Sequence, residues 1–112
     1  MSDLSLSSPH GTITISRDVV ADIVAETAAH CYGVVGLLSG SRVGRILRRD
    51  GVSIEGDAKG IRIELHVVVE YGLNLAEVAA SVRSQVAYEV ERVTGLPVGV
   101  VEVVVQDVKE TA

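Results

Sequence analysis

The stretch "IRIELHVVVEY", Ile61 to Tyr71, alternates apolar and polar side chains over most of its length. A period of two is typical of a β-strand with one buried and one open face. The apolar face comprises Ile61, Ile63, Leu65, Val67, Val69 and Tyr71, and the other face comprises Arg62, Glu64, His66, Val68 and Glu70. Residues 52–55 form a shorter strand before the turn "GDAKG", so we expect the two strands to make an antiparallel hairpin.

Two helices are predicted, one before this hairpin and one after it. The first begins after Ser16, a favourable N-cap residue, and runs to about Cys31. The second begins after Asn74, which forms a capping-box-like pair with Glu77. Gly95, followed closely by a proline, ends the second helix, because glycine suits the left-handed position after a helix and proline prevents its continuation.

Two further strands complete the predicted fold. "GTITIS", residues 11–16, alternates threonine with isoleucine, so we expect Ile13 and Ile15 to point inward. Residues 98–108 are rich in valine and form the last strand. The predicted class is α+β, with two layers, the order βαββαβ, and one mixed sheet that carries both helices on one face.

Length and composition limit the function classes. The 112 residues suit a single domain, which we place at 11–108, between a flexible tail at 1–10 and a short C-terminal tail at 109–112. The net charge of −5 argues against general nucleic-acid affinity, and a single Cys excludes an internal disulfide. With no secretory signal and no apolar run of membrane-spanning length, we expect a cytoplasmic protein.

The candidate chemical groups do not assemble into a site. Asp22, Glu26 and His30 share one helix face, but they spread over two turns and diverge too far to close on one metal ion. His30 precedes Cys31, and neighbouring helix residues point about 100° apart, so the imidazole is badly placed as a base for the thiol. We therefore predict no catalytic residues, no metal site and no cofactor.

The segment "SRVGRILRRDG", residues 41–51, is strongly basic in an acidic chain. The candidate interaction patch in it comprises Arg42, Arg45, Arg48 and Arg49. These arginines could contact phosphates of RNA or of anionic lipid, or they could simply keep a connection between two elements soluble. "GVVG", residues 33–36, matches the bare pattern of the phosphate-contacting loop in KH-type RNA-binding domains, although its central residues are valines.

The polar face of the predicted sheet is a second candidate contact surface. Its members come from the long strand and from the last strand: Arg62, Glu64, His66, Val68, Glu102 and Val104. We expect the two valines to be exposed there. A joined apolar patch on this face would indicate a partner surface.

Several stretches together resemble the bacterial alkaline shock protein family, also called Gls-type general stress proteins. They are "GTITIS" followed by a helix, "GVVGL" after that helix, "VVVEYG" at 67–72 and "VTGLPVGVVEVVVQDV" at 93–108, and the resemblance covers residues 11–108. It implies a non-catalytic stress-response protein of Gram-positive or actinobacterial type. It also implies a place at the inner face of the cell membrane, through a membrane-anchored partner protein and self-association. The alternative is an RNA- or DNA-binding module that uses the arginines and "GVVG".

Overall fold

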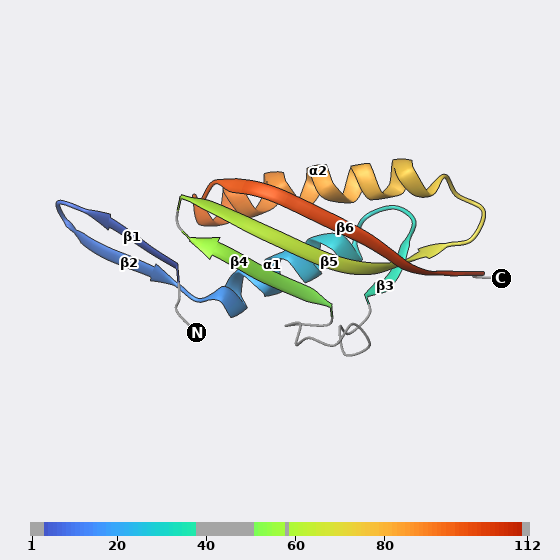
Figure 1. Ribbon diagram of the computed structural model, residues 1–112, viewed down its shortest axis with the longest axis horizontal. Helices are drawn as coiled ribbons and strands as arrows, with labels where there is room; N and C mark the ends of the chain where they lie inside the picture. The colour runs from blue at the N-terminus through green and yellow to red at the C-terminus, as the bar shows by residue number, and fades with distance from the viewer. Residues whose placement is uncertain (1–3, 38–50, 58, 111–112) are drawn as a thin grey trace.

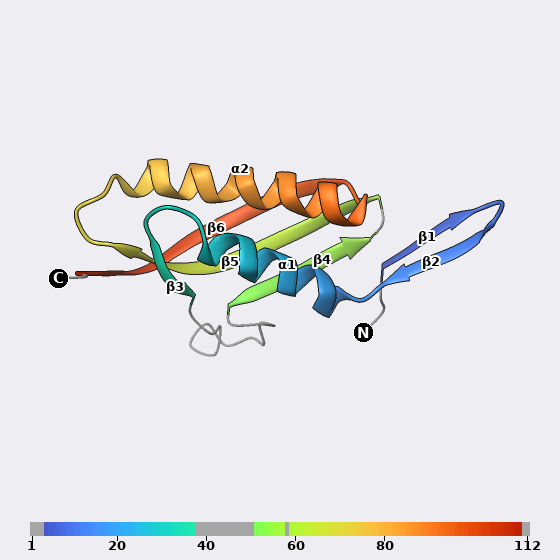
Figure 2. The same cartoon turned by 180° about the vertical axis from the view of Figure 1, so that it is seen from behind.

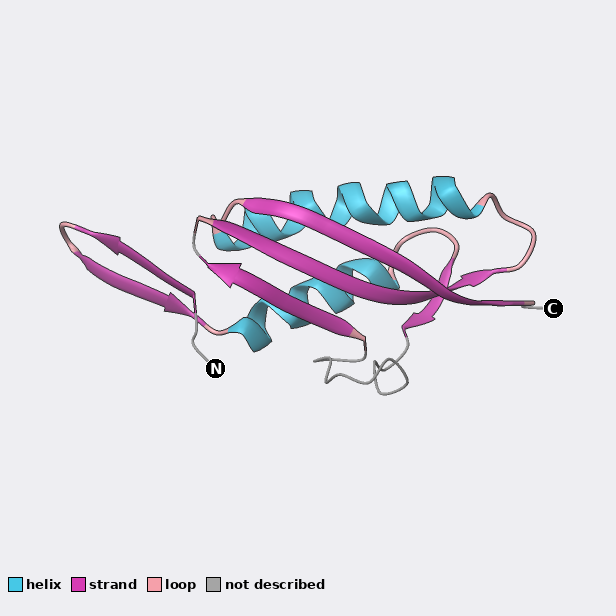
Figure 3. Cartoon of the chain, viewed as in Figure 1, coloured by secondary structure: helices cyan, strands magenta, loops and turns pink. Residues whose placement is uncertain are grey.

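The computed structural model describes residues 4–37, 51–57 and 59–110, and these form an α+β fold (Figures 1 and 3). The elements along the chain are β1 (Leu4–Ser8), β2 (Gly11–Ile15), α1 (Arg17–Ala29), β3 (Val34–Leu37), β4 (Val52–Asp57), β5 (Gly60–Glu70), α2 (Leu75–Thr94) and β6 (Val98–Lys109). The predicted class is confirmed. The order differs from βαββαβ because β1 and β3 are additional strands.

The strand β5 is the centre of a mixed four-stranded sheet. β6 pairs with it in parallel along nearly its whole length, with Leu65 beside Val103. β4 and β3 both pair with it antiparallel, β4 with residues 60–65 and β3 with residues 67–69. Since β6 occupies one edge of β5, β4 and β3 share the other edge, one after the other (Figure 1).

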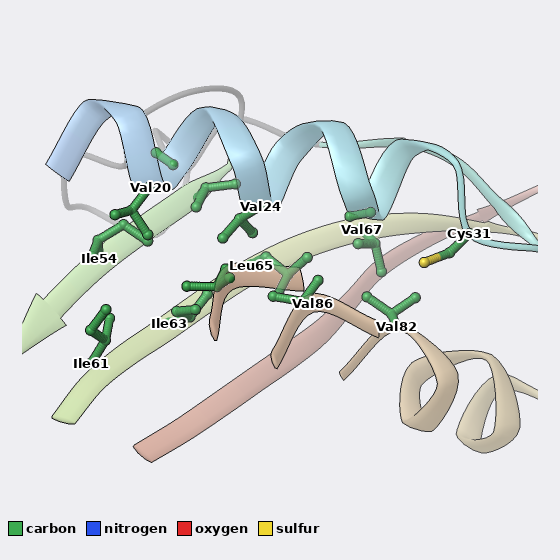
Figure 4. Close-up of a cluster of buried hydrophobic side chains, with 14 of the residues drawn as sticks. Val20, Val24, Cys31, Ile54, Ile61, Ile63, Leu65, Val67, Val82 and Val86 are labelled. Carbon is green, nitrogen blue, oxygen red and sulfur yellow. The ribbon is translucent and has the colours of Figure 1, made fainter. Parts of the chain in front are cut away.

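Both helices cover the same face of this sheet, as predicted (Figure 2). The core lies between the two layers and is built from aliphatic side chains. Ile63, Leu65 and Val67 of β5 meet valines of both helices, such as Val24 and Val86, and all five are fully buried (Figure 4). The alternation that predicted the strand therefore also identified its buried face.

The N-terminal residues differ from the prediction. Residues 1–10 were expected to form a flexible tail and 11–16 a strand of the main sheet. Instead β1 pairs antiparallel with β2 in a separate two-stranded sheet that projects from the body (Figure 1). Leu4 lies opposite Ile15 and is buried in the core, which anchors the base of the hairpin. Ile13, expected to point inward, is exposed because it lies in the projecting part.

The helix ends follow the capping residues in the sequence. The Ser16 hydroxyl accepts a hydrogen bond from the Asp18 N–H at 3.1 Å, and the Asn74 side chain accepts one from the Glu77 N–H at 3.0 Å. Gly95 ends α2 with a φ of 77°, the left-handed conformation that favours glycine. α1 ends at Ala29, slightly before the predicted end at about Cys31.

Candidate protein-contact surfaces

The open face of the sheet brings the predicted contact residues side by side. Arg62, Glu64, His66 and Val68 lie on β5, and Glu102 and Val104 lie on the neighbouring β6. In the register of the two strands, Glu64 pairs with Glu102 and His66 pairs with Val104. Arg62 Nη2 lies 3.7 Å from Glu102 Oε1, so it balances one of the two adjacent carboxylates.

His66 is the one buried polar residue among the described positions, with 3 % of its surface exposed. Its Nδ1 lies 2.6 Å from Gln106 Oε1 and its Nε2 lies 2.8 Å from Glu64 Oε2. Both ring nitrogens therefore have a side-chain oxygen within hydrogen-bond distance. We call His66, Glu64 and Gln106 the His66 cluster. It links β5 to β6 at the irregularity in their register between Val67 and Val68.

The two valines of this face do not form an exposed patch. Val68 is buried and Val104 is half-buried, whereas both were expected to be exposed. The face therefore presents charged and polar groups around a satisfied buried cluster. Its role in partner contact stays a prediction.

The structure describes the "GVVG" residues but not the arginines of the basic segment. Arg42, Arg45, Arg48 and Arg49 lie outside the described residues. "GVVG" is not a phosphate-binding loop, because Val34 and Gly36 pair with Val69 and Val68 as part of the edge strand β3. The KH-type interpretation is therefore wrong at these residues.

The thiol of Cys31 is buried and has no base beside it among the described residues. Its Sγ donates to the Thr27 carbonyl at 3.4 Å, and burial raises the pKa of the thiol. The ring of His30 instead has Nδ1 2.8 Å from the Glu26 carbonyl, on the exposed side of the helix. Within residues 4–37, 51–57 and 59–110, no group of three His, Cys, Asp or Glu side chains could hold a metal ion.

The aromatic residues are all on the surface. The chain has three Tyr, no Phe and no Trp. Tyr32, Tyr71 and Tyr88 are 76 %, 65 % and 68 % exposed. Tyr71 was expected on the inward face of the long strand, but β5 ends at Glu70 and the tyrosine lies beyond it. Aromatic side chains normally supply much of a core, and this core is built without them.

Two of the tyrosines line shallow hollows on the helix layer. Tyr32 borders a hollow of about 230 Å³ beside the first turns of α2, with Leu73 and Glu77 in its wall. Tyr88 borders one of about 350 Å³ between α2 and Thr27 of α1. Each hollow combines an exposed aromatic ring with neighbouring polar groups.

Sequence reasoning missed Gln106 as a partner of His66 and the three tyrosines as a group. The register irregularity that brings Gln106 to the imidazole has no signal in the sequence. The tyrosines had one signal, namely that a chain without Phe or Trp keeps three tyrosines next to glycine or charged residues.

The sequence profile of the ASP23 family, described as having a cell envelope-related function, matches residues 5–110. The chain belongs to this family. It is 34 % identical to the uncharacterized protein YloU of Bacillus subtilis (strain 168), over 96 % of this chain and 97 % of that protein. It is 31 % identical to the stress response regulator gls24 homolog of Streptococcus pyogenes, over 92 % of this chain and 62 % of that protein. The resemblance to the alkaline shock and Gls-type proteins is therefore confirmed.

Solved structures resemble this alkaline shock family chain in fold alone. A double variant of the domain named MamM CTD superposes with a TM-score of 0.58 at 13 % identity, over 86 % of this chain and 84 % of that domain. A zinc form of another variant of that domain gives 0.51 at 14 % identity, over 85 % of this chain and 86 % of that domain. Among the described residues of the present chain, no helix is long and apolar enough to cross a membrane.

Proposed function

We propose that this member of the alkaline shock protein family is a non-catalytic interaction module at the cell envelope. It binds a membrane-anchored protein at the inner face of the membrane and associates with further copies of itself. The observation that carries the proposal is the exposure of every aromatic residue in the chain. Tyrosine is enriched at the centres of protein interfaces, where its ring contributes apolar area and its hydroxyl a hydrogen bond.

The surroundings of the tyrosines support a protein as the ligand. The hollows beside Tyr32 and Tyr88 are open and shallow. The first includes the carboxylate of Glu77 in its wall, and the second includes Glu89, whose carboxylate is already paired with Arg92. Such walls suit side chains of a partner protein, with basic groups at the rim. An anionic lipid headgroup fits the Tyr32 hollow less well because the Glu77 carboxylate would repel it.

The test compares a Tyr32→Ala/Tyr88→Ala double variant with the unchanged protein in fractionated cells of its own host. Loss of two interface anchors should lower recovery with the membrane fraction by about tenfold or more. Surface substitutions of this kind change folding stability little, so both proteins should unfold at similar urea concentrations. Tyr71→Ala is the matched control, because it removes an equally exposed ring that lies in neither hollow, and its recovery should stay unchanged.

Vesicles of anionic lipid without protein separate the two kinds of ligand. The unchanged chain should stay in the supernatant with these vesicles and sediment with native membranes. If it sediments equally with both, the proposed protein partner is wrong. If it never sediments with native membranes, the proposed envelope role itself is wrong.

A further inference from the structure

The outer edge of β6 is an unpaired strand edge. β6 spans twelve residues and pairs only with β5 among the described strands. An edge strand presents alternate N–H and C=O groups that can accept a further strand, and most proteins protect such edges with charges or covering groups. From Val98 to Val105 this strand carries a single charged residue, Glu102, and the other residues are valines and one glycine.

The opposite edge of the sheet shows that this chain does protect an edge. Arg17, at the start of α1, donates from Nη2 to the Gly56 carbonyl at 2.8 Å and from Nη1 to the Ile54 carbonyl at 3.5 Å. These carbonyls belong to β4, which also ends in the charged residue Asp57.

On β6, side chains contact the outer edge only near its two ends among the described residues: the Val98 N–H donates to Glu91 Oε2 at 3.0 Å and the Val108 N–H donates to Asp107 Oδ1 at 2.8 Å. The stretch between these residues points to β6 as the edge that accepts another strand.

A hollow of about 270 Å³ continues the open edge into the helix layer. Its helix wall comprises Ala76, Ala79, Ala80 and Arg83 of α2, and its strand wall comprises Val101, Glu102 and Val103 of β6. Alanine side chains let a second helix approach closely. The surface available for docking therefore has two layers, a strand edge and a helix face of three alanines and Arg83.

We propose that β6 pairs antiparallel with β6 of a second copy, so that one continuous sheet carries the helices of both copies on the same side. This rests on the self-association in the proposed function and specifies its surface. If Val103 of one copy pairs with Val103 of the other, the residues that lie opposite each other share one face of the sheet. Val101 then lies opposite Val105 of the second copy, and Glu102 lies opposite Val104. The two Glu102 carboxylates do not face each other, and each already lies 3.7 Å from its own Arg62.

A second copy fits this surface better than a bound peptide. An extended peptide would pair with the strand edge and leave the alanine face of α2 uncovered. A second copy supplies a strand and a helix in the same two layers, about 10 Å apart. About nine paired residues extend about 30 Å, so the two-layer strip has an outline of about 300 Å² per copy. That is below the roughly 800 Å² per partner of a standard stable interface, so we expect a weak dimer that forms as the protein concentration rises.

The first experiment measures amide hydrogen exchange of the full chain at low and high protein concentration. Exchange in residues 98–109 should slow as concentration rises, because the free N–H groups of β6 become hydrogen-bonded. Residues 52–57 of β4 should show no such change. Protection that appears instead in residues 4–15 would overturn the proposal and assign the contact to the β1–β2 hairpin.

The second experiment measures the dimer dissociation constant by sedimentation equilibrium for Val100→Lys and for its control, Val93→Lys. Val100 is 50 % exposed on β6 and Val93 is 51 % exposed on α2, so both variants place the same charge at equally exposed valines. A lysine in the paired edge should weaken the dimer by about tenfold or more, whereas the control should not change it.

Equal effects of both variants would overturn the β6 surface while leaving self-association intact. A chain that stays monomeric at all concentrations would also overturn it. Recovery of that monomer with native membranes would then show that the partner-binding part of the proposed function is independent of this surface.

Discussion

Replacing His66 with alanine should destabilise the fold far more than a typical change on an open sheet face. The ring is buried and makes two hydrogen bonds, one to the Glu64 carboxylate and one to the Gln106 amide oxygen. A hydrogen bond to a charged group contributes about 2 kcal/mol and a neutral one about 1 kcal/mol, so the expected loss is about 3 kcal/mol. That is a large share of the roughly 5–15 kcal/mol that typically separates folded from unfolded states.

The assay is urea unfolding followed by far-UV circular dichroism. With a denaturant dependence of about 1.5 kcal/mol/M, the loss lowers the midpoint by about 2 M. A double-mutant cycle of His66→Ala and Gln106→Ala should give a coupling free energy of about 1 kcal/mol, because the two side chains share one buried hydrogen bond. The control cycle uses Arg62→Ala and Glu102→Ala, a pair on the same face whose side chains are 56 % and 52 % exposed.

The exposed pair should couple by less than about 0.5 kcal/mol, since solvent screens it. The reasoning fails if His66→Ala costs less than about 1 kcal/mol, which would mean that the ring does not rely on its two partners. It also fails if both cycles give the same coupling free energy, because burial of the His66–Gln106 pair would then not strengthen its interaction relative to the exposed Arg62–Glu102 pair.

Two other measurements test separate parts of the fold. Gly33→Ala should destabilise by about 1–3 kcal/mol in urea unfolding, because Gly33 has a φ of 89° and a Cβ there would lie 2.8 Å from Leu73 Cδ1. Gly36→Ala, at a position with no atom within 4 Å of the added Cβ, should leave the midpoint unchanged or raise it, and equal effects at both glycines would contradict the backbone explanation. Cys31 should react slowly with a thiolate-selective reagent at mildly alkaline pH and quickly once urea unfolds the chain, because burial raises the pKa of the native thiol and keeps it protonated. Fast reaction of the folded protein would show that the thiol is accessible.

The central strand and both helices could be predicted because their patterns are local. The alternation from Ile61 onward defines β5, and Ser16, Asn74 and Gly95 mark helix ends through contacts within a few residues. The strand β1 escaped prediction because its serines were taken as a sign of disorder. Its leucines do alternate, but their partners lie in β2, and only the pairing of Leu4 with Ile15 makes them a strand.

The candidate surfaces could be predicted only in part, because they depend on contacts between residues that lie far apart in the sequence. The face of Arg62, Glu64 and His66 follows from alternation, and the structure places these residues together on β5. The burial of His66 follows from its contact with Gln106, forty residues later, across a register irregularity. The protection of the β4 edge likewise depends on Arg17 reaching a strand that comes much later in the chain.

The unfolding of this protein will hardly change its intrinsic fluorescence. The chain has no Trp, and its three tyrosines already contact water in the folded state. Their emission therefore reports nearly the same surroundings before and after unfolding. A partner that covers Tyr32 or Tyr88 removes water from the ring and changes that emission. Tyrosine fluorescence, a poor probe of folding here, thus becomes a label-free optical signal for docking.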